Sequence, residues 1–258
     1  MEIANKIAMV TGGADGIGRA ITVKLLEKGA QGVAVVDINK EKGSQTVEEL
    51  NAEYGDGKTV FIQCDVSNTS QLEAAYAKVK EDYKRLDIVC NNAGIGDEFN
   101  MELMVAINLT AVIRSTYLAV QYMGTKNGGN GGVVINTASR AGIVPWFPCS
   151  IYTATKHGVV GFTRSVAEEP MIKENKVRVA ALCPGDVDTP LIASGIKCRY
   201  PRELKLSLER FPPMTPSHVA DNVMLIIEDV KYDGDACLVY PGKPLTVIDP
   251  PNLEEILK

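Results

Sequence analysis

The chain has 258 residues, of which 45% are hydrophobic and 23% charged, so it can bury the core of one large α/β domain or two small ones. Its formal net charge of -5 and the lack of a basic run argue against a nucleic-acid-binding surface. No stretch approaches ~20 uninterrupted apolar residues, so we expect no membrane span. The first residues reach glycines too early for a signal peptide.

Six cysteines are scattered along the chain, at positions 64, 90, 149, 183, 198 and 237. Their spacing fits neither a disulfide framework nor a zinc site. Only two histidines are present, so we expect no histidine-based metal site. Buried free thiols in a reduced compartment explain the pattern best. The sequence therefore predicts a soluble, cytoplasmic, single-domain protein without a metal.

Short apolar runs rich in valine and isoleucine alternate with stretches of helical period along the whole chain. Strands are predicted at residues 6–12, 32–37, 59–65, 86–94, 131–139, 177–185 and 236–242. Helices are predicted at about 16–28, 40–53 and 99–124. Three more helices are predicted to begin at a capping box at 70–73, near Ser150 and at Thr215-Pro216. Strict alternation of this kind predicts a single α/β domain over 1–258. Its expected fold is a Rossmann-like, doubly wound parallel sheet of about seven strands flanked by helices.

Two segments depart from this regular pattern. Pro170 falls late in the helix that starts near Ser150 and removes a backbone donor, so we expect that helix to end or kink near Glu169. The segment 186–214 lacks clear periodicity and carries four prolines. Because a long irregular insertion in a compact domain is usually a functional lid or a mobile loop, we predict that 186–214 is a substrate lid.

A glycine-rich turn, TGGADGIG at 11–18, lies between the first predicted strand and the first helix. Glycines there let the backbone turn sharply and approach a pyrophosphate, which the helix N-terminus stabilises. Asp37 closes the second strand, where a carboxylate accepts hydrogen bonds from a ribose diol and repels a 2′-phosphate. Asp15 and Ile38 stand where an NADP-binding protein would carry Arg or Lys. The prediction is NAD over NADP.

The stretch from Ser139 to Lys156 carries the candidate chemistry. If Tyr152 and Lys156 lie on one helix, they share a face one turn apart, and the ammonium favours the phenolate. A phenol titrates near ~10, so its use as a base around neutrality needs a shift of roughly three units, or ~4 kcal/mol. Ser139 can hold the substrate oxygen that exchanges its proton with the phenol. The tyrosine–lysine pair alone is weak, because this spacing occurs by chance on many amphipathic helices.

Together these motifs resemble the short-chain dehydrogenase/reductase family across essentially the whole chain. Further matching pieces are Asp65-Val66, NNAG at 91–94, Asn108, and Pro184-Gly185 with Thr189. They occur in the family's order and at its spacing. The resemblance implies an NAD-dependent oxidoreductase that acts on the CH–OH group of a secondary alcohol and produces a ketone.

The resemblance also implies which residues bind the cofactor. From the pyrophosphate to the nicotinamide they are Gly12, Gly16, Ile17 and Gly18, then Asp37 and Ile38 at the adenosine ribose, Asp65 and Val66 at the adenine, Asn92, Ala93 and Gly94 in the cleft, and Tyr152, Lys156, Pro184, Gly185, Val187 and Thr189 at the nicotinamide end.

The catalytic residues that the resemblance implies are Asn108, Ser139, Tyr152 and Lys156. Tyr152 would remove the alcohol proton, and Ser139 would steady the developing carbonyl oxygen. Lys156 would lower the pKa of the phenol and reach the nicotinamide ribose. Asn108 would anchor a water beside Lys156 in a proton relay.

A closer resemblance is to the family's branch of NAD-dependent 15-hydroxyprostaglandin dehydrogenases, in FIQCDV at 61–66 and YTATKHGVVGFTRS at 152–165. It implies oxidation of a secondary allylic alcohol on a lipid-like substrate. That branch has a substrate-contacting glutamine three residues before the tyrosine, where this chain has Cys149. Trp146 makes the same wall bulkier and more apolar. Ser139, Trp146, Cys149 and Tyr152 are therefore the expected substrate contacts, and a hydrophobic alcohol other than prostaglandin is an alternative substrate.

The family resemblance implies a homodimer that pairs through the helix at about 99–124 and the helix that starts near Ser150. An alternative function is a dehydrogenase of steroid, retinoid, terpenoid or fatty alcohols, and the segment 186–214 does not discriminate between them. A more remote alternative is a catalytically idle binding protein. Such proteins usually lose the tyrosine or the lysine, whereas this chain keeps both.

Overall fold

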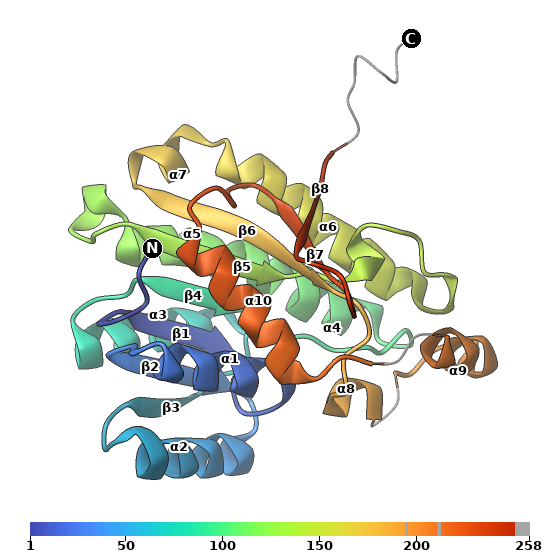
Figure 1. Cartoon of the computed structure of the whole chain (residues 1–258), viewed down its shortest axis with the longest axis horizontal. Coiled ribbons are helices and arrows are strands. Elements are labelled where there is room, and N and C mark those ends of the chain that lie inside the picture. Colours follow the sequence, from blue (N-terminus) through green and yellow to red (C-terminus); the bar gives the residue numbers. More distant parts are fainter. Residues whose placement is uncertain (194–195, 211–212, 251–258) are drawn as a thin grey trace.

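The structure of the protein is a computed structural model that describes residues 1–193, 196–210 and 213–250. Its centre is an eight-stranded sheet in the order β3-β2-β1-β4-β5-β6-β7-β8 (Figure 1). The strands in chain order are β1 (Ile7–Thr11), β2 (Gly32–Asp37), β3 (Thr59–Gln63), β4 (Ile88–Asn91), β5 (Gly132–Thr137), β6 (Val177–Pro184), β7 (Ala236–Val239) and β8 (Thr246–Ile248). All neighbouring pairs are parallel except β7 and β8. The predicted doubly wound parallel sheet is confirmed.

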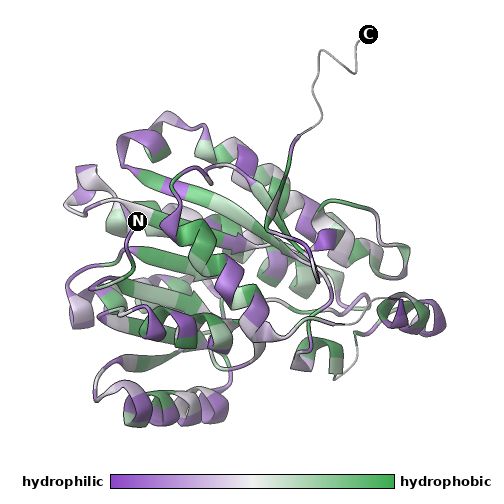
Figure 2. Ribbon diagram, in the orientation of Figure 1, coloured by the Kyte–Doolittle hydropathy of each residue, from purple (hydrophilic) through white to green (hydrophobic). Residues whose placement is uncertain are grey.

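Helices cover both faces of the sheet. One face packs against α1 (Gly16–Glu27), α2 (Lys40–Tyr54) and α10 (Pro216–Glu228), and the other against α3 (Thr69–Tyr83), α5 (Ala111–Met123), α6 (Ser150–Ala167) and the short α7 (Pro170–Glu174). Within β1, Ala8 and Val10 belong to the first core and Ile7 and Met9 to the second. Both faces of the central strands are therefore apolar. In Figure 2 these strands are coloured mainly as hydrophobic along their length.

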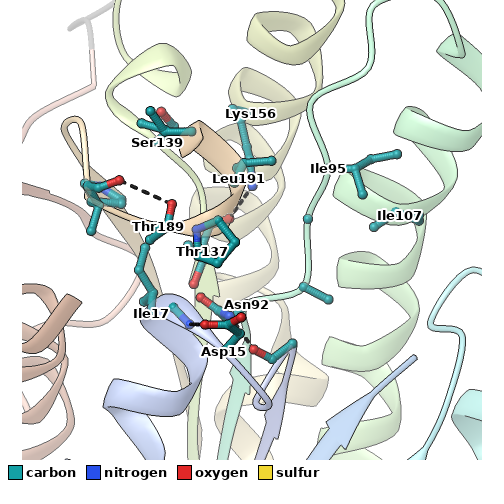
Figure 3. Close-up of a pocket in the computed structure, with 18 of the residues that line it drawn as sticks. Asp15, Ile17, Asn92, Ile95, Ile107, Thr137, Ser139, Lys156, Thr189 and Leu191 are labelled. Atoms are coloured by element: carbon teal, nitrogen blue, oxygen red, sulfur yellow. Dashed lines mark hydrogen bonds between the residues drawn. The ribbon is translucent and has the colours of Figure 1, made fainter. Parts of the chain in front are cut away.

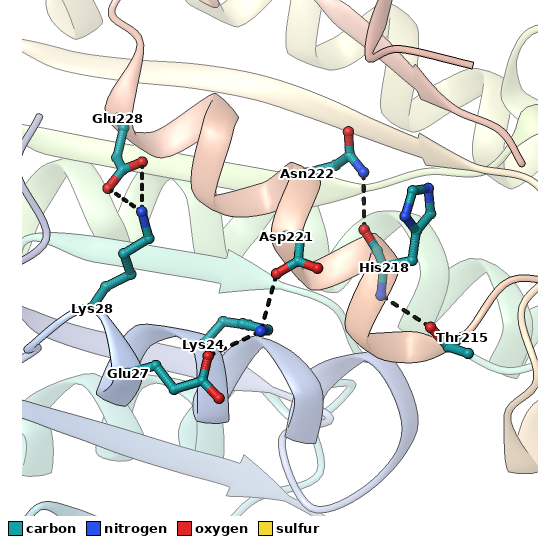
Figure 4. A network of polar contacts seen from close by, with 8 residues as sticks. All are labelled: Lys24, Glu27, Lys28, Thr215, His218, Asp221, Asn222 and Glu228. Atoms are coloured by element: carbon teal, nitrogen blue, oxygen red, sulfur yellow. Dashed lines mark hydrogen bonds and ion pairs between the residues drawn. The ribbon is translucent and has the colours of Figure 1, made fainter. Parts of the chain in front are cut away.

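The contact between α1 and α10 has a polar edge outside its apolar core (Figure 4). Lys24 pairs with Asp221 at 3.1 Å, and Lys28 pairs with Glu228 at 3.0 Å. The side chain of Thr215 accepts a hydrogen bond from the backbone N–H of His218 and so caps α10. The predicted start of this helix at Thr215-Pro216 is confirmed.

Three sequence predictions about elements need correction. Asn68, not Ser70, caps α3, because the Asn68 side chain accepts a hydrogen bond from the N–H of Gln71. The strand β8 was not predicted, since its three residues are too few to form a recognisable pattern. The helix expected at 99–124 consists of α4 (Met101–Val105), one π-helical turn (Ala106–Thr110) and α5.

The helical stretch Met101–Met123 is long and apolar enough to cross a membrane by length and composition alone. Its mean hydropathy is 1.6, although single polar residues interrupt its apolar runs. Ala111, Ala119 and Val120 pack into the core beneath the sheet. Core packing therefore accounts for the apolar residues on this face.

Prolines mark helix starts in the second half of the chain. Helix α6 ends at Ala167 and Pro170 begins α7, so the predicted end of the long helix near Glu169 is confirmed. The segment 186–214 was predicted to be irregular, but it contains α8 (Pro190–Ala193) and α9 (Pro201–Glu209). An isolated bridge between Val187 and Met214 joins its two ends, and another between Asp97 and Lys197 attaches its interior to the segment after β4. Residues 194–195 and 211–212 of this predicted lid lie outside the described residues.

Candidate active site

A cavity of about 330 Å³ opens at the carboxyl edge of the parallel sheet. This is the edge at which open α/β sheets bind their ligands. Nearly all the residues predicted to bind cofactor line it: Gly12, Gly16, Ile17, Asp37, Ile38, Asp65, Val66, Asn92, Ala93, Gly94, Tyr152, Lys156, Pro184, Gly185, Val187 and Thr189. Figure 3 shows how side chains from distant segments converge there. Gly18 and Asn108 lie behind the cavity wall.

The glycine turn between β1 and α1 leaves no room for side chains. Gly12 has a φ of 63°, and a Cβ on it would lie 3.0 Å from the Cα of Ala93. A Cβ on Gly18 would lie 2.0 Å from the carbonyl oxygen of Gly12, so Gly18 permits the turn to pack against α1. The backbone is thus exposed to the cavity at the N-terminus of a helix, an arrangement that suits a pyrophosphate.

Thr11 and Asn92 fasten this turn to the end of β4. The Thr11 hydroxyl accepts hydrogen bonds from the N–H groups of Asn92 at 3.0 Å and Ala93 at 3.1 Å. The Asn92 side chain donates to the carbonyl oxygens of Thr11 and Gly12 at 3.2 and 3.3 Å. Asn92 therefore fixes the shape of the turn as well as lining the cleft.

Asp37 at the end of β2 is held by backbone donors. Its carboxylate accepts hydrogen bonds from the N–H groups of Ala14 at 3.1 Å and Asn39 at 2.9 Å. Nearby, Lys42 forms an ion pair with Asp15, the N-cap residue of α1. Burial raises the pKa of Asp15, but its hydrogen bonds with Lys42 and the Gly16 N–H outweigh burial and lower the pKa. The sequence analysis did not predict Lys42 near the site. Its positive charge is compensated there by Asp15, which lines the cavity.

The other end of the cavity holds a serine, a tyrosine and a lysine. The phenol of Tyr152 is hydrogen-bonded to Ser139, whose own oxygen accepts from the N–H of Ala141 at 3.1 Å. Lys156 Nζ donates to the carbonyl oxygen of Thr137 at 2.8 Å and lies 5.5 Å from the centroid of the Tyr152 ring. The three side chains predicted from their spacing are therefore brought together.

Burial controls the titration of this cluster. It raises the pKa of Tyr152 to about 12, and hydrogen bonding to Ser139 only partly offsets it. Burial lowers the pKa of Lys156 to about 8. In the protein alone desolvation dominates the pKa of Tyr152, and the lowering of that pKa by Lys156 stays a prediction.

Asn108 lies in the π-helical turn and is completely buried. Its side-chain oxygen accepts from the N–H of Ile95, and its side-chain nitrogen donates to the carbonyl of Ile95, both at 2.9 Å. It therefore holds in place the segment after β4 that carries Gly94 and lines the cavity. Its role in a water relay stays a prediction.

The start of α6 is fixed by Glu98, a residue that sequence reasoning missed. Its carboxylate accepts hydrogen bonds from the backbone N–H groups of Ile151 at 3.0 Å and Tyr152 at 2.8 Å. A carboxylate at a helix N-terminus satisfies free donors and complements the helix dipole. Glu98 thereby sets the position of the helix that carries Tyr152.

Trp146 forms the aromatic wall of the cavity. Its ring packs edge-on against Tyr152, with centroids 6.2 Å apart, and its Nε1 donates to Ser207 in α9 at 2.9 Å. Cys149 does not line the cavity as expected: its side chain is buried beside Cys198. Phe147 points outward to pair with Tyr200, at 5.8 Å between ring centroids. The three-residue helical turn at 147–149 directs these side chains away from the site.

The remaining wall was not visible in the sequence. It is formed by Ile95, Ile107, Leu191, Ile192 and Ile196, together with a charged pair, Arg140 and Asp186. Apart from Ile107 in the π-helical turn, these residues come from the segments that follow β4, β5 and β6, whose sequences have no clear period. Thr137 also lines the cavity, and its buried hydroxyl has no hydrogen-bond partner among the described residues.

These observations decide what the cavity can hold. The bare glycine backbone, the carboxylate of Asp37 and the orphaned Thr137 hydroxyl fit a dinucleotide that extends along the strand ends. Within residues 1–193, 196–210 and 213–250, no group of three or more His, Cys, Asp or Glu side chains is arranged to hold a metal ion. All six cysteines are free and buried.

Comparison with known proteins gives consistent matches. Residues 6–197 match the family model described as short chain dehydrogenase. The chain is 42% identical to 15-hydroxyprostaglandin dehydrogenase [NAD(+)] of Bos taurus and to the enzyme of that name from Homo sapiens, over 94% of this chain and 94% of each relative. It is 37% identical to 3beta-hydroxysteroid dehydrogenase 2 of Eggerthella lenta, over 78% of this chain and 77% of that protein.

A solved structure shares the fold. It is a short chain dehydrogenase/reductase from Burkholderia phymatum in complex with NAD, which matches with a TM-score of 0.78. The match covers 88% of this chain and 87% of the other, at 23% identity. The sheet and its helices are therefore arranged as in that protein.

Proposed function

This chain belongs to the short-chain dehydrogenase family, and we propose that it oxidises a secondary alcohol of a hydrophobic, lipid-like substrate to a ketone with NAD. One observation carries the proposal: Ser139, Tyr152 and Lys156 lie at one end of a cavity whose other end is a bare glycine turn. The relatives named as NAD-dependent 15-hydroxyprostaglandin dehydrogenases support the cofactor and the reaction class. The family predicted from the motifs is confirmed.

The cofactor would lie along the strand ends, from the glycine turn to Lys156. Gly12 and Gly16 would face the pyrophosphate, with Gly18 behind them, and Asp37 would accept hydrogen bonds from the adenosine ribose. A Cβ on Gly94 would lie 3.7 Å from Lys156 Nζ, so this bare backbone leaves the ammonium accessible to a ribose hydroxyl. When bound, NAD⁺ supplies the acceptor for the hydrogen that leaves the carbinol carbon as hydride.

The chain's own residues handle the proton and the oxygen. Tyr152 would take the proton of the substrate hydroxyl, and Ser139 would donate a hydrogen bond to the oxygen as it becomes a carbonyl. Because burial raises the pKa of Tyr152 to about 12, the phenol needs positive charge around it to act as a base near neutrality. Lys156 would provide part of that positive charge. Asn108 would hold in place the backbone at Ile95, next to Gly94 and close to Lys156.

The substrate chamber is mainly apolar, as expected for a lipid-like alcohol. Trp146, Ile107, Leu191, Ile192 and Ile196 form its wall. A sterol-type alcohol is the second candidate, because the chain is also 37% identical to a 3beta-hydroxysteroid dehydrogenase. A catalytically idle binding protein is disfavoured because Asn108, Ser139, Tyr152 and Lys156 are all present.

A screen for NADH formation tests this function directly. The purified protein is mixed with NAD and, separately, with prostaglandins, steroids, retinoids, terpenols and fatty alcohols, and absorbance at the NADH band is followed. We expect turnover of at least one secondary alcohol. No NADH from any of these substrates would contradict the proposal and favour a binding protein.

We also propose a single domain with 186–214 as the substrate lid, a homodimer that pairs through α5 and α6, and a cytoplasmic location. Helix α9, in this segment, is attached to the aromatic wall of the cavity by the Trp146–Ser207 hydrogen bond. On the side proposed for the dimer contact, Tyr117 of α5 is partly exposed and packs on Phe162 of α6, at 5.9 Å between ring centroids. A monomeric mass by light scattering at micromolar concentration would contradict the dimer.

A further inference from the structure

A largely buried ion pair lies among the mainly apolar side chains of the proposed substrate chamber. Arg140 Nη2 lies 3.3 Å from each carboxylate oxygen of Asp186, and the two side chains are 17% and 10% exposed. Arg140 directly follows Ser139, and Asp186 follows Pro184-Gly185 at the end of β6. Both residues line the cavity.

The guanidinium keeps donors available. Of its five N–H groups, only those on Nη2 face Asp186, and both contacts are at the long end of the hydrogen-bond range. The guanidinium carbon lies 5.4 Å from the centroid of the Trp146 ring, and this cation–π contact holds the group against the chamber wall. Asp186 likewise keeps acceptor capacity, because an ionised carboxylate has about four lone-pair sites.

A purely apolar substrate would gain nothing from this pair. Removing two charges from water costs free energy, and the contact of a single Arg140 nitrogen with Asp186 offsets only part of that cost. The pair as a whole is neutral, so it does not select for a charged substrate. A donor and an acceptor side by side are complementary to a hydroxyl group, which can accept from Arg140 and donate to Asp186.

We propose that Arg140 and Asp186 are specificity-determining residues that bind a second hydroxyl group of the substrate, near the carbinol that is oxidised. This inference rests on the proposed function and specifies its substrate class as hydroxylated hydrophobic alcohols. Position supports it. Trp146 contacts both groups, with its ring 5.4 Å from the Arg140 guanidinium carbon and 6.2 Å from the phenol ring, and Arg140 directly follows Ser139, so the pair and the reacting groups line the same part of the cavity.

The test compares matched alcohols on one carbon skeleton. A secondary mono-alcohol is measured against diols that carry the second hydroxyl two, three or four carbons away. For each, kcat/KM is determined with NAD for the wild type, Arg140→Met, Asp186→Asn and the double variant. A matched control is Arg85→Met, which breaks the pair between Arg85 and the buried Asp87 outside the cavity.

At one spacing we expect the wild type to prefer the diol over the mono-alcohol by roughly tenfold to a hundredfold, as a hydrogen bond to a charged group gives. Arg140→Met and the double variant should lose this preference, and Arg85→Met should keep it. The double variant leaves no unpaired buried charge, so it decides the question if Arg140→Met does not fold. A wild type without diol preference, or an undiminished preference in the double variant, would overturn the inference.

Binding gives a readout that does not need turnover. Trp146 is the single tryptophan of the chain, so its emission reports on this wall. Each alcohol is titrated into protein saturated with NADH, which cannot oxidise it, and the dissociation constant is read from the tryptophan signal. If no alcohol is oxidised, the proposed function fails. The inference about Arg140 and Asp186 is then decided by binding alone: the diol must bind the wild type more tightly than the mono-alcohol does, and the double variant must lose this difference.

Discussion

The two ends of the cavity are built in different ways. At the cofactor end, backbone atoms and the residues that hold them define the shape: Gly12, Gly18 and the Thr11–Asn92 hydrogen bonds. At the substrate end, side chains on short helices and connections define it, as Trp146 and Ile196 illustrate.

This difference determines how each end responds to substitution. A backbone cradle has no tolerance for an added carbon, because the clash is with atoms that cannot rotate away. A side-chain wall can lose or exchange a group and keep its overall shape, so its changes should alter which alcohol fits. The following predictions test that contrast, starting from the residue where the two ends meet.

The largest effect is expected for Tyr152→Phe. Loss of a positioned proton-transfer group should lower kcat by roughly a thousandfold, within the range typical of general acid–base groups. NADH binding, measured by fluorescence titration, should change little because the ring is retained. Tyr200→Phe, at the exposed residue that precedes α9, is the matched control. Wild-type activity in Tyr152→Phe would rule out the proposed chemistry.

Gly18→Ala should damage the cofactor end with a single carbon. Its Cβ would lie 2.0 Å from the Gly12 carbonyl oxygen, so the turn must shift. A distortion of about 1–3 kcal/mol should weaken NAD binding by roughly tenfold to a hundredfold. Gly161→Ala in α6, where a Cβ meets nothing within 4 Å, should leave binding unchanged. Equal NAD dissociation constants for the two variants would contradict a backbone-defined site.

Asp37→Ala should change cofactor choice. It removes the carboxylate that Ala14 and Asn39 orient, and with it about tenfold or more of the preference for NAD over NADP. The measurement is the ratio of kcat/KM for the two cofactors, with Asp37→Asn as the isosteric comparison. A wild type that uses both cofactors equally well would refute the role of Asp37 in selectivity.

Lys156 should make stability depend on pH. Its folded pKa of about 8 lies below its usual 10.5, so between these values the unfolded chain binds more protons and stability rises with pH. The cost of burying the charge is therefore full below pH 8 and disappears above about 10.5. Relative to Lys156→Met, the wild type should gain roughly 2–3 kcal/mol of unfolding free energy from pH 7 to pH 10. Urea unfolding at both pH values measures it, and a constant difference would show that Lys156 is not desolvated.

Trp146→Phe should have the smallest effect, confined to the substrate end. It removes the hydrogen bond to Ser207, about 1 kcal/mol, and should raise KM for a hydrophobic alcohol by roughly fivefold. KM for NAD should stay the same. Ser207→Ala should reproduce the change, and the double variant should add nothing further. A strictly additive double variant would mean that this hydrogen bond does not hold α9.

The sequence by itself predicted the residues at the glycine-turn end of the cavity and the cluster of Ser139, Tyr152 and Lys156 at its other end. Glycines at 12, 16 and 18, the acid at 37 and the tyrosine–lysine pair at 152 and 156 are signals because local backbone geometry and helix spacing require those residue types. The alternating apolar runs likewise predicted seven of the eight strands, since a parallel sheet buried on both faces needs continuous apolar segments.

Only the tertiary structure decided the substrate end. Arg140 and Asp186 are 46 residues apart, and nothing in either local sequence indicates that they pair. Cys149 was expected in the wall and is buried, whereas Ile196 and Leu191 were not expected and line it. Glu98 accepts hydrogen bonds from the first backbone N–H groups of α6, although it lies 53 residues before Ile151 in the chain. Such contacts depend on how separate segments pack against one another, and that packing leaves no period or spacing in the sequence from which to infer it.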